Sequence, residues 1–196
     1  MLKAKIGDRL DPFLYRTSRL LRRMGLRPNA LTFIGLGLNG LAAWALAVGE
    51  WSSAAGLIIL AGFFDILDGA TARNCREASP FGSFLDSVTD RYSDLGLLLG
   101  LLLSYSRTGG LLYPVLLGFG LMGTALVPYT RARAESVISA CPVGILERPE
   151  RILLLFLGAA IPALMPLVIW TLAVLTNVTV IQRILYTRRA MERAGG

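Results

Sequence analysis

The chain contains no histidine, and this absence is the first limit on its chemistry. Histidine is the usual acid–base group near neutral pH and a common metal ligand, so both kinds of histidine chemistry are excluded. The only two cysteines, Cys75 and Cys141, have no CxxC-like spacing, so we expect two unpaired structural thiols in a reducing compartment. Carboxylates, hydroxyls, thiols and Tyr, Lys or Arg side chains remain for any catalysis.

Charged residues are also scarce, at 17% of the chain, whereas 54% of the residues are hydrophobic. The mean hydropathy of +0.59 is well above that of a soluble domain. Several apolar runs approach the roughly 20 residues that an α-helix needs to cross a bilayer. The composition therefore predicts an all-α integral membrane protein with little room for a separate soluble domain.

We predict six transmembrane helices, at about residues 30–49, 51–72, 82–104, 111–134, 150–164 and 166–187. Pro162 and Pro166 bracket a tight turn between the last two, because one helix over 150–187 would be too long for a single crossing. Basic and apolar residues alternate before the first span, which favours an interfacial amphipathic helix. The expected organisation is a juxtamembrane helix (1–28), a six-helix transmembrane domain (29–190), in which any active site would lie, and a cytoplasmic tail (191–196).

The basic residues are distributed unevenly over this arrangement. Of the 20 lysines and arginines, all except Arg107 fall on one side of the membrane. The positive-inside rule places that side in the cytoplasm, together with both termini. The first 29 residues have no early apolar core with a small-residue cleavage site, so we expect no cleavable signal peptide. These patterns predict a multi-pass protein of the cell (inner) membrane.

Four aspartates lie at the ends of two neighbouring apolar runs. Asp65 and Asp68 are three residues apart near the end of the second span, and Asp86 and Asp90 are four apart near the start of the third. Both spacings place the two side chains on one helix face. A short connection makes the two helices antiparallel neighbours, so we expect the four carboxylates to converge on the cytoplasmic side.

Converging carboxylates repel each other unless cations intervene. Hard oxygen donors without histidine or cysteine nearby favour Mg²⁺, Mn²⁺ or Ca²⁺, and two such ions could clamp a phosphoryl displacement. Gly69 and Gly82 leave space for a ligand beside the acids, and Arg73 is placed to meet an anion. Gly62, one turn deeper, is expected to serve close helix packing.

The acidic stretch reads D-G-x2-A-R-x8-G-x3-D-x3-D from Asp68 to Asp90, with Asp65 three residues earlier. These positions match the signature of the CDP-alcohol phosphotransferase family, which the chain therefore resembles. The segment from Pro28 to Thr32 also looks like that family's P-N-x-L-T opening of the first span.

The resemblance implies transfer of a phosphatidyl group from a CDP-linked lipid such as CDP-diacylglycerol to an alcohol, with release of CMP. It implies two Mg²⁺ or Mn²⁺ ions held by the aspartates, with Asp90 also acting as general base and catalytic residue, and a homodimer. The residues expected to bind the CDP donor are Asn29, Thr32, Asp68, Gly69, Ala72, Arg73 and Gly82.

A second cluster of basic residues bears on the acceptor alcohol. The segments Y-x-R-A-R-A-E, from Tyr129, and G-x-x-E-R-x-E-R, from Gly144, resemble the prokaryotic phosphatidylinositol-phosphate synthases of this family. That resemblance implies an acceptor carrying a phosphate, L-myo-inositol 1-phosphate, bound by Arg131, Arg151 and Arg183. Glycerol 3-phosphate is the alternative acceptor, as in a phosphatidylglycerophosphate synthase.

A different class of protein, a divalent-cation transporter, would also place aspartates within its membrane spans. However, all four aspartates are expected near one membrane face, and the opposite side offers no continuing polar path. The sequence therefore favours an enzyme of phospholipid biosynthesis over a transporter.

Overall fold

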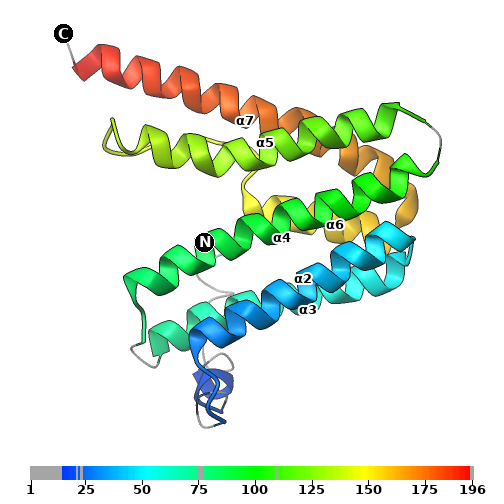
Figure 1. Cartoon of the computed structure of the whole chain (residues 1–196). Helices are drawn as coiled ribbons and strands as arrows, with labels where there is room; N and C mark the ends of the chain where they lie inside the picture. Colours follow the sequence, from blue (N-terminus) through cyan, green and yellow to red (C-terminus); the bar gives the residue numbers. More distant parts are fainter. Residues whose placement is uncertain (1–14, 21, 23, 75–76, 109, 195–196) are drawn as a thin grey trace. The chain divides into compact units, whose positions relative to one another are not determined.

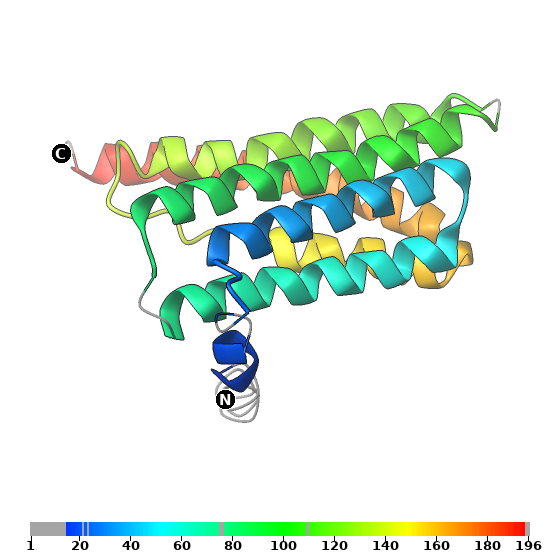
Figure 2. The ribbon, with the colours of Figure 1, turned by 60° about the horizontal axis from the view of Figure 1, so that its bottom comes forward.

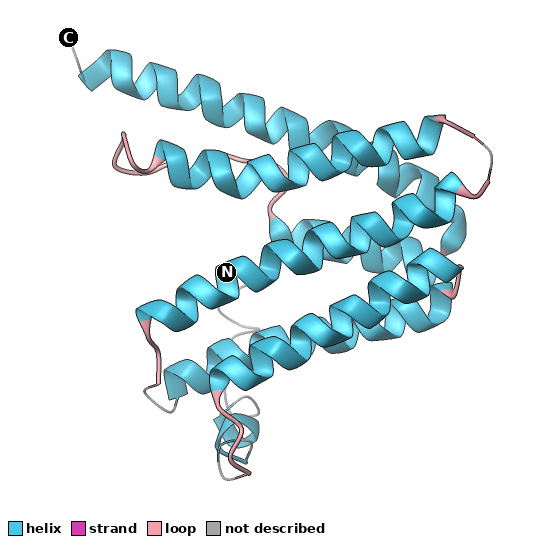
Figure 3. Cartoon of the chain, in the orientation of Figure 1, coloured by secondary structure: helices cyan, strands magenta, loops and turns pink. Residues whose placement is uncertain are grey.

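The computed structural model describes residues 15–20, 22, 24–74, 77–108 and 110–194. Most of the expected amphipathic helix and Cys75 lie outside the described residues, but residues 15–20 and 22 are helical. The described part of the chain is all-helical and contains no strand (Figure 3), which confirms the predicted all-α class.

The helices follow the order of the predicted spans, labelled as in Figure 1. Within the described residues from position 28 onward there are six α-helices and one 3-10 turn. Their bounds are α2 Pro28–Val48, α3 Trp51–Asn74, α4 Pro80–Ser106, α5 Leu112–Ala134, α6 Arg148–Ala160, η1 Pro162–Leu164 and α7 Met165–Ala194. The 3-10 turn falls between Pro162 and Pro166, where the sequence predicted a turn.

Local sequence signals explain where several helices start and stop. Ser79 precedes α4, and its hydroxyl oxygen accepts a hydrogen bond from the backbone N–H of Gly82 at 3.0 Å, while Pro80 occupies the first helical position. At the end of α2, Gly49 has φ +84, and the N–H of Glu50 donates to the carbonyl of Ala45 at 2.9 Å. This is the hydrogen-bond pattern of a glycine-terminated helix.

The chain divides into two compact units. The first comprises residues 1–41 and 56–93, and the second comprises residues 42–55 and 94–196. In the first unit, α2 and α3 approach near Gly35, where an added Cβ would lie 3.8 Å from both the Ala61 carbonyl oxygen and the Phe64 Cβ. The N-terminal part of α4 completes the described helices of this unit.

In the second unit, α5 and α7 lie side by side and run in the same direction (Figures 1 and 2). Small residues permit the close approach: a Cβ at Gly123 would overlap the Thr176 side chain. Elsewhere in this unit, an added Cβ at Gly100 would overlap the backbone of Ala43, and Arg107 donates to the carbonyl oxygen of Ala47 at 3.0 Å. Gly62, in contrast, has no described atom of this chain within 4 Å of an added Cβ, so the expected close packing there has no partner among the described residues.

Four segments of the described chain are long and apolar enough to cross a membrane: Pro28–Val48, Trp51–Asn74, Leu112–Ala134 and Pro162–Arg193. Large apolar side chains are also exposed along the helices, such as Trp44 at 65% and Phe33 at 56%. Exposure of many large apolar side chains is costly in water but favourable in a bilayer. The chain is therefore a membrane protein. Helix α6, with 13 residues, rises only about 20 Å.

Candidate active site

Three of the predicted aspartates meet in the first unit. Asp65 and Asp68 on α3 and Asp86 on α4 each offer one carboxylate oxygen, and these oxygens lie within 4.8 Å of one another. The sequence spacing accounts for this, because each helix presents its acids on one face. Asp90 follows Asp86 on the same face of α4 and is outside this group of three.

Helix α2 orients one of the three carboxylates. The hydroxyl of Thr32 donates a hydrogen bond to Oδ2 of Asp68 at 2.7 Å. The side chain of Asp68 is largely buried, and such a bond fixes which way its second oxygen points. Sequence reasoning assigned Thr32 to the donor site, and this contact adds a second role, the orientation of Asp68.

A cavity of about 230 Å³ opens beside these acids, entirely within the first unit. All seven residues predicted to bind the CDP donor line it: Asn29, Thr32, Asp68, Gly69, Ala72, Arg73 and Gly82. Sequence reasoning missed Glu77, Ser79 and Ser83, which also line the cavity. Glu77 is held by an ion pair with Arg22 at 2.6 Å, a contact that no local spacing could reveal.

The two glycines of the cavity leave space for neighbouring polar groups. A Cβ at Gly69 would lie 3.3 Å from Nη1 of Arg73, so the glycine lets this guanidinium lie against the helix. A Cβ at Gly82 would lie 3.1 Å from the Ser79 hydroxyl and 3.5 Å from Oδ1 of Asn29. Larger residues at either position would crowd these polar groups of the cavity wall.

The acidic group fits a divalent cation. Three carboxylates whose oxygens approach within 4.8 Å repel one another, and a cation between them removes that repulsion. The donors are all hard oxygens, which suit Mg²⁺ or Mn²⁺. Next to a cavity that also carries Arg73, such a site can hold a metal-bound, phosphate-containing ligand.

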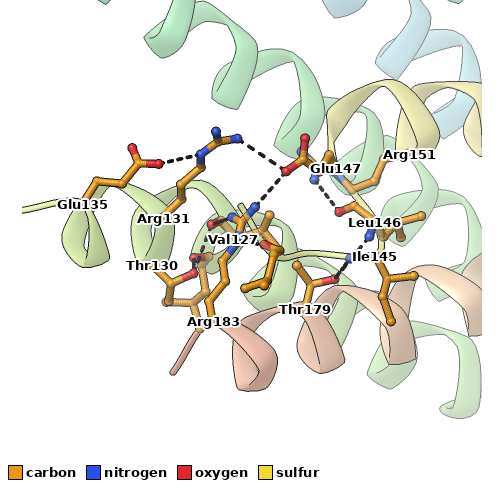
Figure 4. Close-up of polar contacts among 12 residues, drawn as sticks. Val127, Thr130, Arg131, Glu135, Ile145, Leu146, Glu147, Arg151, Thr179 and Arg183 are labelled. Atoms are coloured by element: carbon orange, nitrogen blue, oxygen red, sulfur yellow. Dashed lines mark hydrogen bonds and ion pairs between the residues drawn. The ribbon is translucent and has the colours of Figure 1, made fainter. Parts of the chain in front are cut away.

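The three predicted acceptor arginines gather in the second unit around the start of α6 (Figure 4). Oε1 of Glu147 lies 3.0 Å from Nη2 of Arg183 and 3.4 Å from Nη1 of Arg131. Arg151 donates to the neighbouring carbonyl oxygen of Leu146 at 3.3 Å. Residues separated by up to 52 positions along the chain are thus assembled at one short segment, Leu146–Glu147.

Acidic residues balance this cluster. Buried Asp94 forms ion pairs with Arg151 and, at 3.5 Å, with Arg148. Glu135 accepts a hydrogen bond from Nε of Arg131 at 3.1 Å, and this bond lowers the pKa of the Glu135 carboxyl. Asp94 is thus paired with arginines of this cluster. The role of Glu147 was missed, although its place in E-R-P-E-R next to Arg148 was a signal.

Comparisons with known proteins agree with the resemblance seen in the motif. Residues 26–185 match the family CDP-alcohol phosphatidyltransferase. An archaetidylinositol phosphate synthase from Pyrococcus horikoshii is 34% identical over 96% of this chain and 98% of its own length.

The crystal structure of Mycobacterium tuberculosis phosphatidylinositol phosphate synthase with CDP-DAG bound superposes with a TM-score of 0.83. It is 28% identical and covers 89% of this chain and 92% of that protein. The same protein has been solved in complex with manganese and citrate, at a TM-score of 0.79 and 29% identity, covering 89% of this chain and 88% of that one. The matched family, the fold and the acidic site all agree, and the transporter alternative is set aside. The chain is a membrane enzyme that belongs to the CDP-alcohol phosphatidyltransferase family.

Proposed function

We propose that this enzyme transfers a phosphatidyl group from CDP-diacylglycerol to L-myo-inositol 1-phosphate and releases CMP. The observation that carries the proposal is the cavity of the first unit, where every residue expected to bind the CDP donor lies beside three converging carboxylates. The neighbours' names support the acceptor, because the Pyrococcus and Mycobacterium proteins are both inositol phosphate synthases that differ in the lipid part of their names.

The reaction is a displacement at the phosphorus that carries the diacylglycerol. The acceptor's hydroxyl oxygen forms a new P–O bond there, and the bond to the bridging oxygen of the diphosphate breaks, so that CMP leaves with that oxygen. Asp90 takes the proton of the hydroxyl; a carboxylate is a weak base, but it needs only hydrogen-bond reach as the new bond forms. Asp65, Asp68 and Asp86 are the principal metal ligands, and Asp90 shares one ion.

Two Mg²⁺ ions, or Mn²⁺ in their place, neutralise charge on the diphosphate and on the leaving group when bound. Arg73 contacts the diphosphate from the cavity wall, and Gly69 and Gly82 allow the donor to approach the backbone. Thr32 holds Asp68 in its ligating orientation through the 2.7 Å hydrogen bond. Asn29 and Ala72 complete the donor contacts.

Arg131, Arg151 and Arg183 bind the phosphate of the acceptor in this proposal. Guanidinium groups are well suited to phosphate because they can donate two parallel hydrogen bonds. Their gathering around Leu146–Glu147 supports a phosphorylated acceptor. Glycerol 3-phosphate carries the same group and remains the alternative acceptor, whereas serine or choline would not need three arginines.

We further propose that all six helices from α2 to α7 enter the membrane, including α4 and the short α6. An interfacial amphipathic helix (1–28) precedes the catalytic domain (29–190), and a short tail (191–196) follows it. The active site and both termini are cytoplasmic, because 19 of the 20 basic residues belong to that side. The enzyme is proposed to be a homodimer of the cell membrane.

The proposal is tested by measuring CMP release and lipid products from the purified full-length protein. CDP-diacylglycerol and Mg²⁺ are supplied with equal concentrations of inositol 1-phosphate, glycerol 3-phosphate and serine in competition. We expect the inositol phosphate lipid to dominate and a metal chelator to abolish CMP release. Preferential formation of the glycerophosphate lipid would overturn the acceptor, and no CMP with any acceptor would overturn the reaction.

A further inference from the structure

Glu147 occupies an unusual position for an acidic residue at a helix start. It is the residue before α6, with an extended backbone, and within the described chain its side chain makes no capping hydrogen bond to its own helix. Acidic side chains at helix starts commonly accept hydrogen bonds from the first backbone N–H groups. Here the carboxylate reaches Arg131 on α5 and Arg183 on α7 instead (Figure 4).

Arg183 has other anchors besides Glu147. Its Nε donates to the carbonyl oxygen of Val143 at 2.9 Å, its Nη1 donates to the carbonyl oxygen of Val127, and the side chain is only 2% exposed. Two backbone acceptors from different segments therefore fix the guanidinium in place. The ion pair with Glu147 adds charge balance to an arginine that is already positioned.

The carboxylate itself is accessible. The Glu147 side chain is 45% exposed, and that of Arg131 is 47% exposed, so a solute can reach the oxygen that joins the two arginines. Arg131 also has a second acidic partner, Glu135, and can keep that contact if Glu147 moves away. The pair between Glu147 and Arg131 is exposed on both sides, and exposed ion pairs are weak, so this contact can be exchanged.

We propose that Glu147 is a displaceable internal anion. Its carboxylate pairs with the guanidinium groups of Arg131 and Arg183 until the acceptor's phosphate replaces it. The inference rests on the proposed function, in which these arginines bind that phosphate. A phosphate monoester carries more negative charge than one carboxylate and has three acceptor oxygens, so it can compete for both guanidiniums. A neutral alcohol cannot, and Glu147 thereby selects for phosphorylated acceptors.

Removal of the Glu147 charge separates this proposal from a purely structural role. If Glu147 competes with phosphate, Glu147→Gln strengthens phosphate binding, because the competitor is gone while the backbone anchors of Arg183 remain. If Glu147 instead holds the arginines in place, the same substitution loosens them and weakens phosphate binding. The two explanations predict opposite signs for one measured affinity.

The experiment compares the full-length wild-type protein with Glu147→Gln and Glu192→Gln. Glu192 is the matched control, because it also pairs with an arginine, Arg188 at 2.8 Å, which is not one of the cluster's arginines. Calorimetry measures binding of inorganic phosphate and of inositol 1-phosphate, and steady-state assays give KM and kcat. For Glu147→Gln we expect both dissociation constants and the acceptor KM to fall by about 3- to 10-fold.

The same assays can also contradict the proposal. Unchanged or weaker binding in Glu147→Gln, or an equal gain in Glu192→Gln, would overturn the proposal. The KM for CDP-diacylglycerol should stay at the wild-type value and so reports intact folding. If Glu147→Gln does not fold, Glu147→Asp takes its place, because its shorter side chain retracts from the arginines and should also strengthen binding.

Failure of this inference is distinguishable from failure of the proposed function. Tighter phosphate binding in Glu147→Gln together with turnover of glycerol 3-phosphate alone would support the role of Glu147 and contradict inositol 1-phosphate as the acceptor. Normal synthesis of the inositol phosphate lipid with unchanged phosphate affinity in Glu147→Gln would support the proposed acceptor and contradict the role of Glu147.

Discussion

The acidic cavity of the first unit and the arginine cluster of the second unit handle charge in opposite ways. In the cavity, like charges converge, with oxygens of Asp65, Asp68 and Asp86 within 4.8 Å of one another. In the cluster, each of the main arginines has an acidic partner, such as Asp94 for Arg151 and Glu147 for Arg183. The first arrangement suits a bound cation, whereas the second is largely balanced within the protein, and its arginines are proposed to bind the acceptor's phosphate.

The largest expected effect is loss of activity in Asp68→Asn. Removing one carboxylate of the three weakens metal binding and the charge stabilisation that the metal supplies, so we expect CMP release to fall by about 10³-fold or more. Thermal unfolding without added metal should occur at the same temperature or a higher one, because a like-charge repulsion is removed. A large loss of thermal stability with little loss of activity would contradict the comparison.

Neutralising the buried acid of the second unit should lower the stability of the fold. Asp94→Asn leaves Arg151, whose side chain is 5% exposed, without its carboxylate, and a broken buried ion pair costs about 3–5 kcal/mol. Thermal unfolding in detergent, followed by intrinsic fluorescence, should show a much lower midpoint.

Glu192→Gln is the control for Asp94→Asn. It breaks a pair whose side chains are 76% and 59% exposed, so it should change stability by about 0.5 kcal/mol or less. Equal midpoints for Asp94→Asn and the wild type would show that the Asp94 pair does not stabilise the fold.

A smaller effect is expected from Thr32→Val, which removes the hydrogen bond to Asp68 but keeps the side-chain shape. Loss of a bond that orients a metal ligand typically weakens metal affinity by about 10-fold. The Mg²⁺ concentration for half-maximal CMP release should rise accordingly, and the rate at saturating Mg²⁺ should change little.

Thr89→Val is the control for Thr32→Val, because the Thr89 hydroxyl donates to the carbonyl oxygens of Leu85 and Asp86 on its own helix. It should leave the Mg²⁺ dependence at the wild-type value. A similar shift in both variants would mean that general packing near the acids, and not the bond to Asp68, sets metal affinity.

Several features could be predicted from sequence because they depend on local periodicity. The spacing of Asp65 and Asp68 on one helix and of Asp86 and Asp90 on the next follows from helix geometry, and the first three meet as expected. The apolar runs gave the order of the helices. The short α6, Arg148–Ala160, differs from the expected 150–164 because its N-terminus is set by Glu147 and Pro149 and its C-terminus by the turn at Pro162.

Other features depended on contacts between distant segments. The pairing of Glu77 with Arg22 and the opposition of Gly123 and Thr176 join residues whose separation carries no periodic signal. Gly62 shows the converse, since no described atom of this chain lies within 4 Å of a Cβ added there. The sequence shows which residues are charged or small, but it does not show which distant residue each of them contacts.

By itself, the sequence determined the membrane character, the helical class and the carboxylates that gather beside the donor cavity, because these follow from hydropathy and from the 3.6-residue period of the helix. Only the tertiary structure decided which acid faces which arginine. Asp94 pairs with Arg151, and Glu147 joins Arg131 and Arg183, because packing brings α4, α5 and α7 to the start of α6 in the second unit. Electrostatic partners are chosen by distance in space, and that distance is set by helix packing.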